Sequence, residues 1–259
     1  MFEGSDAVKI CSGVIAHDDG IPGIPRVMIE TVGAWTGGLL DFIFPNQCLL
    51  CDGPLQVGED LVCDPCWSRL PPVEDPVSAG LLCRDAMDEI RAGYYYTEDF
   101  QKIIHHLKYH RHTRLARRIG LRLYDVLRAN PTWLASDVIV PVPMHKIKQR
   151  ERGYNQAAEM ARSLSSHCGI PCREDILVKK AHTVSQTKMS EAAGRIANMS
   201  EVLVSKSGVR LDGRQVILVD DLITTGATAN ACANALKKAG AASVRVLTAG
   251  RPYFGASPV

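Results

Sequence analysis

Two adjacent carboxylates and a run of small hydroxyl residues lie close together near the carboxyl end of the 259-residue chain. Residues 216–228 read VILVDDLITTGAT, which places Asp220 and Asp221 just before a hydroxyl-rich loop. That loop consists of Thr224, Thr225, Gly226, Ala227 and Thr228. Its backbone N–H groups, hydroxyls and helix N-terminus would favour a phosphate, whereas the carboxylates suit sugar hydroxyls or a metal ion. A ligand that suits both parts would have a phosphate at one end and a diol at the other, as a ribose phosphate does.

A buried strand and a helix must hold this stretch in place. The apolar residues 216–219 predict a strand covered on both faces of a parallel sheet, and the Ala-rich segment after Thr228 predicts a helix that ends near Gly240. The acids then lie at the carboxyl end of a strand, where open α/β sheets bind ligands. The alternative is an ordinary strand–helix turn with acids at its mouth, but such turns rarely combine two acids with a hydroxyl loop.

A second apolar strand, predicted at residues 138–142, leads into a cationic loop over residues 143–153. The cations of this loop are Lys146, Lys148, Arg150 and Arg152. A helix is predicted to follow, with Asn155 as its N-cap. If this cationic loop lies at the same edge of the sheet as the hydroxyl-rich loop at residues 224–228, its cations would face a second anion. A solvated basic turn is the alternative.

Two C-x-x-C pairs lie eleven residues apart in the first third of the chain. Their cysteines are Cys48, Cys51, Cys63 and Cys66. Four thiolates at this spacing can close a tetrahedral shell around Zn²⁺, and a closed shell predicts a structural site. Reduced structural thiols are the alternative. Cys83 stands alone, and we interpret it as a small buried apolar residue in preference to a leftover ligand; residues 72–79 before it are predicted to form a linker.

Residues 98–130 predict one or two helices with an apolar face and a basic face. The basic residues, with no acid between them in the sequence, are Lys102, Lys108, Arg111, Arg114, Arg117 and Arg118. Four histidines, His105, His106, His110 and His112, fall in the same stretch. A solvated face with incidental histidines is favoured over a metal site, and the functional alternative is a surface that meets phosphates. Tyrosines 94–96 and 109 are expected to pack in the core, although they could stack on bases.

The composition is that of an ordinary globular protein. Charged residues make up 22%, hydrophobic residues 46%, and the formal net charge is +2, so there is no global signature of a polyanion-binding protein. No apolar run approaches the ~20 residues that span a bilayer. Residues 27–44 have roughly helical spacing and are expected to pack on the protein itself, not to anchor it in a membrane. The N-terminus lacks the basic region of a secretory signal, so a cytoplasmic location is expected.

Three blocks of the sequence together resemble the ComF family of phosphoribosyltransferase-like proteins. They are VPVPMHKIKQRERGYNQ from Val140, SQTKMS from Ser185 and VDDLITTGAT from Val219, and the last resembles the PRPP-binding motif of type I phosphoribosyltransferases. An LKY-containing helix, here residues 107–109, also fits. The resemblance spans about residues 39–251. It implies an α/β, type I phosphoribosyltransferase-like fold with a mostly parallel sheet, preceded by a small zinc-ribbon-like module.

The sequence predicts three parts of the chain. Residues 1–35 are predicted to be a poorly ordered extension, residues 36–85 the cysteine module, and residues 90–259 the phosphoribosyltransferase-like domain. Shorter strands are expected at 92–96, 202–204, 209–211 and 244–247, and residues 179–200 are too polar for a core element and are predicted to form a flap. Many relatives carry further metal cysteines, and their absence here predicts one zinc site.

The resemblance also implies roles for the site residues. Asp220 and Asp221, both expected to be ionised, would hold the ribose hydroxyls of PRPP as the catalytic acids. Residues 224–228 would bind its 5-phosphate, and the four cations of the loop would bind its pyrophosphate. The expected activity is Mg²⁺-dependent phosphoribosyl transfer to an unknown acceptor. Two alternatives remain: an accessory protein of DNA uptake that binds single-stranded DNA or a helicase, and a PRPP sensor without turnover.

Overall fold

A computed structural model describes residues 47–77, 81–110, 112–180 and 202–253 of the chain. The predicted N-terminal extension, the helix at 27–44 and residues 181–200 of the predicted flap lie outside the described residues. Among the helices of the described part, none is both long and apolar enough to cross a membrane.

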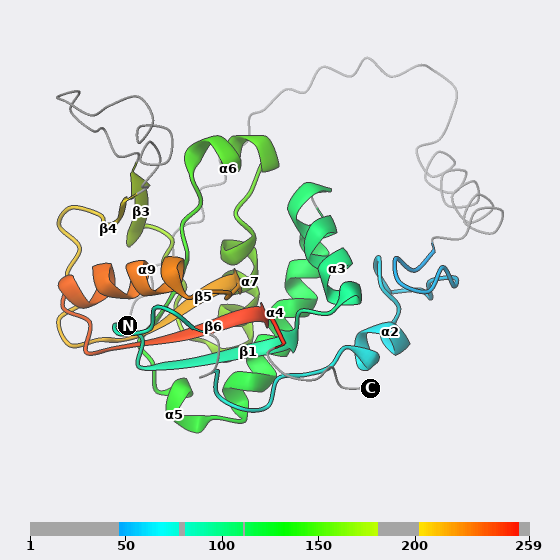
Figure 1. The fold of residues 1–259 in the computed structure, drawn as a ribbon, viewed down its shortest axis with the longest axis horizontal. Coiled ribbons are helices and arrows are strands. Elements are labelled where there is room, and N and C mark those ends of the chain that lie inside the picture. The colour runs from blue at the N-terminus through cyan, green and yellow to red at the C-terminus, as the bar shows by residue number, and fades with distance from the viewer. Residues whose placement is uncertain (1–46, 78–80, 111, 181–201, 254–259) are drawn as a thin grey trace, which may run out of the picture. The chain divides into compact units, whose positions relative to one another are not determined.

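A four-stranded parallel sheet forms the centre of the described structure (Figure 1). Its strands lie in the order β1 (Glu89–Tyr95), β6 (Ser243–Arg251), β5 (Gln215–Leu222) and β2 (Val138–Pro141). Every neighbouring pair is parallel. The prediction of a mostly parallel α/β sheet is therefore confirmed.

Helices cover both faces of this sheet, which explains why β5 reads as a continuous apolar run (Figure 1). On one face Ile217 and Val219 of β5 pack with α3 (Glu98–Tyr109), α4 (Thr113–Arg128) and α7 (Gln156–Cys168). On the other face Val216 and Leu218 pack with α9 (Ala227–Lys238). Side chains alternate along a strand, so one apolar run can fill two cores.

The remaining elements are short. A four-residue helix, α5 (Pro131–Leu134), precedes β2, and α6 (Lys146–Arg152) follows it. Strands β3 (Leu177–Lys180) and β4 (Val202–Ser205) form a separate antiparallel pair. The strand predicted at 209–211 is wrong: the Leu211 N–H donates to the Ala239 carbonyl at 2.8 Å, so this backbone closes the turn after α9 instead of joining a sheet.

The cysteine-containing segment packs against α3 and α4. It contains the short helix α2 (Asp64–Arg69), and its buried Trp67 and Leu70 belong to the same core as Phe100. Two surface ion pairs join the same parts: Arg114 to Asp60 at 2.8 Å and Arg118 to Asp64 at 2.5 Å. The basic face that the sequence predicts on α4 is therefore partly neutralised by acids from this segment.

The predicted linker after this segment is held against the edge of the sheet. Its Val73 and Val77 N–H groups donate to the carbonyls of Gly93 and Ile90 in β1, at 3.1 and 2.8 Å. Val73 and Val77 are both buried. These contacts cover the outer edge of β1, which would otherwise expose unpaired backbone groups.

Candidate functional site

The hydroxyl-rich loop joins the carboxyl end of β5 to the N-terminus of α9. Gly226 is the N-cap of α9 and adopts φ +81°, a left-handed conformation that favours glycine. No side chain caps the helix, and Thr224, Thr225 and Thr228 are exposed. The Ala227 N–H already donates to Thr225 Oγ1 at 3.4 Å. The next N–H groups of α9 and the exposed hydroxyls of Thr224 and Thr228 are available to an anion.

Residues 81–87 hold this loop from behind, a role that nothing in the sequence indicates. The N–H groups of Leu82 and Cys83 both donate to the Thr225 carbonyl, at 3.0 and 3.1 Å. The Ala86 N–H donates to Asn230 Oδ1 in α9 at 2.9 Å. These bonds use backbone donors of residues 82, 83 and 86, which carry no side-chain signature. Cys83 lies outside the cysteine cluster, and its N–H group helps to hold the loop.

The two acids lie at the end of β5, as predicted, but their surroundings differ. Asp221 Oδ2 is 2.7 Å from the ammonium of Lys108 on α3, and both side chains are about four-fifths buried. Asp220 accepts the Asp221 N–H on Oδ1 at 2.8 Å. Burial and the neighbouring charge of Asp221 raise the pKa of Asp220 well above its usual value. This works against the expectation that both acids are ionised.

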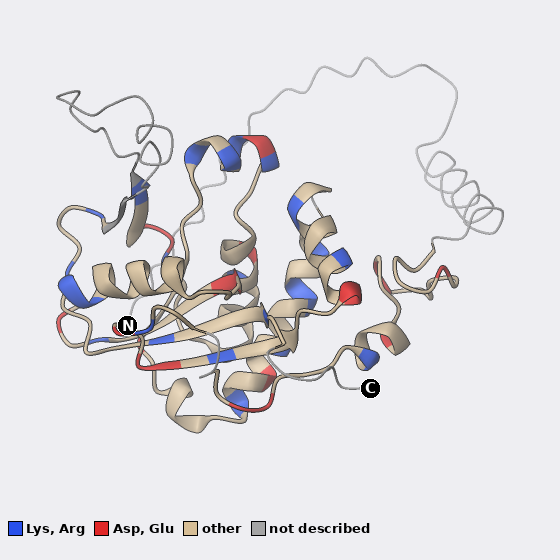
Figure 2. Cartoon of the chain, viewed as in Figure 1, with Lys and Arg blue, Asp and Glu red and all other residues tan. Residues whose placement is uncertain are grey.

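The predicted cationic loop is a short helix, α6, which begins after the carboxyl end of β2. Lys, Gln, Arg and Glu are good helix formers, and Gly153 ends the helix in a left-handed conformation. The Val142 N–H donates to the Val219 carbonyl at 2.8 Å, which brings this segment to the edge of the sheet where the acids lie. Figure 2 shows blue cations along α6, at the top of the view. None of the four forms an ion pair within the described residues.

The C-terminal end of α3 is tied to the end of α6. The Tyr154 hydroxyl donates to the Leu107 carbonyl, and burial raises the pKa of Tyr154 to about 12, which keeps this donor protonated. The Arg152 guanidinium lies 5.2 Å from the centre of the Tyr109 ring. Residues 107–109 therefore connect the cationic helix with the acids of β5.

The histidines of α3 and its C-terminal junction lie with their rings close together. His106 stacks on His110 at 4.5 Å between ring centres, and His112 lies 5.9 Å from His106. Among the described residues, the four cysteines are the one group of three or more side chains placed to share a metal ion. A metal site at the histidines, which the sequence disfavours, gains no support.

The cysteine cluster has the dimensions of a zinc site. All four Sγ atoms lie within 4.8 Å of one another, and Cys51 Sγ is 3.8 Å from Cys63 Sγ. A tetrahedron with Zn–S bonds of ~2.3 Å has an edge of about 3.8 Å. Cys48 Sγ also accepts the Cys63 N–H at 3.4 Å, an outer contact that orients a thiolate ligand. The cluster supports a structural zinc.

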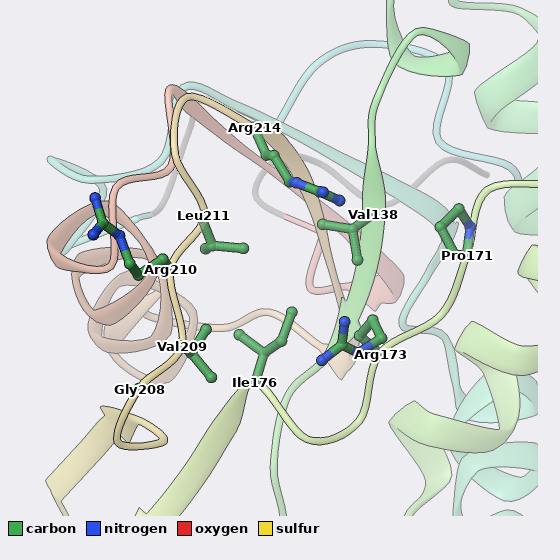
Figure 3. A pocket seen from close by; sticks show the side chains of 9 residues that line it. All are labelled: Val138, Pro171, Arg173, Ile176, Gly208, Val209, Arg210, Leu211 and Arg214. Carbon is green, nitrogen blue, oxygen red and sulfur yellow. The ribbon is translucent and has the colours of Figure 1, made fainter.

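A hollow of about 310 Å³ lies at the opposite end of the sheet, where β2 and β5 begin (Figure 3). Three arginines line it together with apolar side chains. Two of these arginines are paired with acids, Arg173 with Asp175 at 2.7 Å and Arg210 with Asp212 at 3.1 Å. None of the predicted site residues lines this hollow, so it belongs to a different part of the molecule.

Comparison with known proteins relates both parts of the chain to established families. Residues 108–251 match the model of the phosphoribosyl transferase domain, and residues 39–87 match the double zinc ribbon domain. Competence protein F of Haemophilus influenzae is 28% identical over 222 residues, which cover 78% of this chain and 96% of that protein. The DNA utilization protein YhgH of Escherichia coli is 27% identical over 219 residues, with 78% and 95% covered.

Competence protein ComFC of Bacillus subtilis is 25% identical over 240 residues, with 78% of this chain and 93% of that protein covered. The resemblance and fold class inferred from the sequence are thereby confirmed, while the predicted boundaries at 36–85 and 90–259 remain predictions. A phosphoribosyl transferase domain over more than half of the chain, preceded by a double zinc ribbon, identifies this protein as a member of the phosphoribosyl transferase family, in its ComF branch.

Proposed function

We propose that the protein binds PRPP with Mg²⁺ and transfers its phosphoribosyl group to an acceptor. One observation carries the proposal: two carboxylates near the end of β5 are followed, within a few residues, by the N-terminus of α9, whose N-cap residue Gly226 has no side chain. This order supplies partners for a ribose diol and a phosphate within one short stretch. The cations of α6 form no ion pair with the residues that the structure describes, and they suit the pyrophosphate.

In the proposed reaction the C1–O bond to pyrophosphate breaks, its electron pair leaves with pyrophosphate, and a bond forms from C1 to the acceptor. The loop at residues 224–228 holds the 5-phosphate and fixes the sugar. The acids hold the ribose hydroxyls and stabilise positive charge that develops on the ring, while Lys146, Lys148, Arg150 and Arg152 stabilise the leaving group. Mg²⁺, which prefers oxygen ligands such as these carboxylates and phosphates, would neutralise pyrophosphate charge.

Calorimetry with PRPP and Mg²⁺ tests the binding step, with wild type and Asp221→Asn side by side. Release of pyrophosphate in the presence of a panel of acceptors tests transfer. Binding without pyrophosphate release for any acceptor would favour a PRPP sensor over an enzyme. No binding to wild type would refute the proposal.

A second candidate is an accessory role on DNA, through single-stranded DNA or a helicase partner. The names of the relatives, a competence protein and a DNA utilization protein, favour it. So do the exposed side chains of Lys146, Lys148 and Arg150. If single-stranded DNA binds there, its affinity should fall steeply with salt, and the double variant Lys148→Glu, Arg150→Glu should flatten the slope by about 0.7 per lost contact. Lys238→Glu, an exposed change on α9, is the control, and equal slopes in both would exclude α6.

A further inference from the structure

Lys108 is a cation that the fold places at the acid pair, and no part of the predicted site includes it. Its ammonium is 2.7 Å from Asp221 Oδ2, with 22% of the Lys108 side chain and 20% of the Asp221 side chain exposed. The position beside the Asp221 carboxylate is therefore already occupied by a positive charge in the ligand-free protein.

The backbone that carries Lys108 is well fixed. Leu107, directly before it, is fully buried, and the Leu107 carbonyl accepts the Tyr154 hydroxyl. Tyr109, directly after it, lies under the Arg152 guanidinium. Because Tyr154 and Arg152 hold both neighbours, the backbone of Lys108 is fixed where its side chain reaches Asp221. An ion pair made by a surface lysine without such fixed neighbours would contribute little to stability.

An ammonium and a divalent metal ion compete for the same carboxylate oxygen. The Asp220 and Asp221 carboxylates are hard oxygen donors of the kind that Mg²⁺ and Mn²⁺ prefer, and the ion pair with Lys108 shows that Asp221 accepts a cation here. A metal ion could bind this pair only if the Lys108 ammonium moved away. Mg²⁺ that arrives with a pyrophosphate-bearing ligand brings further interactions that offset this displacement.

We propose that Lys108 is a positioning residue that occupies the place of a metal ion at Asp221. In the ligand-free protein its ammonium pairs with Asp221 and prevents a free divalent ion from binding to the acids. When Mg²⁺ and PRPP bind together, the ammonium moves away from Asp221. This inference rests on the proposed function for the identity of the ligand, while the exclusion of a free metal ion does not depend on it.

Mn²⁺ alone, without PRPP, is the direct probe, measured by electron paramagnetic resonance or calorimetry on the zinc-loaded full chain. Lys108→Met should bind Mn²⁺ at least about tenfold more tightly than wild type, which corresponds to about 1.4 kcal/mol. Lys102→Met is the matched control, because Lys102 is on the same helix, is 54% exposed and lies 3.9 Å from Asp99. Adding Asp221→Asn to Lys108→Met should abolish the gain, and Lys108→Arg, which keeps the charge, should show none.

Equal Mn²⁺ affinity in Lys108→Met and Lys102→Met, with both variants folded, would overturn the proposal. If Lys108→Met does not fold, Lys108→Gln replaces it, and wild type offers an independent measurement: PRPP should raise its affinity for Mn²⁺, and Mn²⁺ bound at Asp221 equally tightly without PRPP would also overturn the proposal. If wild type binds no PRPP, the proposed function fails, but the comparison of the lysine variants still decides the role of Lys108.

Discussion

The Cα of Gly226 faces the carbonyl oxygen of Cys83 so closely that a Cβ added to Gly226 would lie 2.3 Å from this oxygen. The side chains of Leu81 and Met87 would lie 3.4 Å from the same Cβ. A residue of the candidate phosphate loop is thus packed against the segment that follows the zinc ribbon. The loop depends on glycine for two separate reasons, its positive φ and this contact.

Gly226→Ala separates these two reasons when it is compared with Gly208→Ala. Gly208 has φ +82°, nearly the same as Gly226, but a Cβ added to Gly208 would have no other atom within 4 Å. We expect Gly208→Ala to lower the free energy of unfolding by about 1–2 kcal/mol through φ alone. Gly226→Ala should lower the free energy of unfolding by about 1–3 kcal/mol more than Gly208→Ala, because of the added contact. Of the two variants, only Gly226→Ala should weaken PRPP binding. Urea denaturation and calorimetry measure both effects, and equal losses in the two variants would show that the contact with Cys83 is unimportant.

Metal analysis of the purified protein should find about one zinc per chain. Cys48→Ser with Cys51→Ser should remove it and lower the melting temperature, because α2 and its surroundings have little core of their own without the metal. The control is Cys168→Ser with Cys172→Ser, a pair of cysteines outside the cluster. Full zinc retention in the first double variant would exclude Cys48 and Cys51 as ligands.

The two acids of β5 should differ in how they affect stability. Because the folded-state pKa of Asp220 is raised above its unfolded value, stability due to this group is fully present below about pH 4 and is lost as the pH rises through the folded-state pKa. Asp220→Asn should therefore melt close to wild type near pH 4 and at a higher temperature than wild type at pH 8. Asp221→Asn should show no such gain, since it leaves the Lys108 ammonium without its partner. A difference between Asp220→Asn and wild type that does not change with pH would contradict this account.

The ion pair between Arg118 and Asp64 should contribute only modestly to stability. Both side chains are well exposed, at 45% and 63%, although Arg118 also lies 5.9 Å from the centre of the Trp67 ring. A double-mutant cycle with Arg118→Met and Asp64→Asn should give a coupling of about 0.2–1 kcal/mol. Arg117→Met, the neighbouring arginine without an ion pair in the described structure, should give no coupling with Asp64→Asn. A coupling above this range would mean that the pair is a main attachment of the zinc ribbon to α4.

Much of the fold could be predicted because its signals are local in sequence. The apolar run Val216–Val219 predicts a buried strand, and the paired cysteines predict a compact cluster, each from a few neighbouring residues. The structure confirms both predictions. The sequence also reveals the cations of α6, but it predicts a loop where good helix formers make a short helix.

The contacts that complete the site were not predictable in this way. In the sequence Lys108 is one of several cations on a basic face, and only the folded position of α3 brings it to Asp221. The bonds from Leu82 and Cys83 to the Thr225 carbonyl use backbone atoms, which every residue has. Similarly, the acids that pair with Arg114 and Arg118 come from a distant part of the chain.

The hydrogen bond from Ala86 to Asn230 has a consequence for the order in which the protein can assemble. The two residues are 144 positions apart, so the segment after the zinc ribbon is made early but cannot complete its contacts until α9 has left the ribosome. Long-range closures of this kind are slow relative to local ones. We therefore expect the zinc ribbon to acquire its metal during synthesis, while the segment behind the phosphate loop is among the last parts of the nascent chain to become ordered.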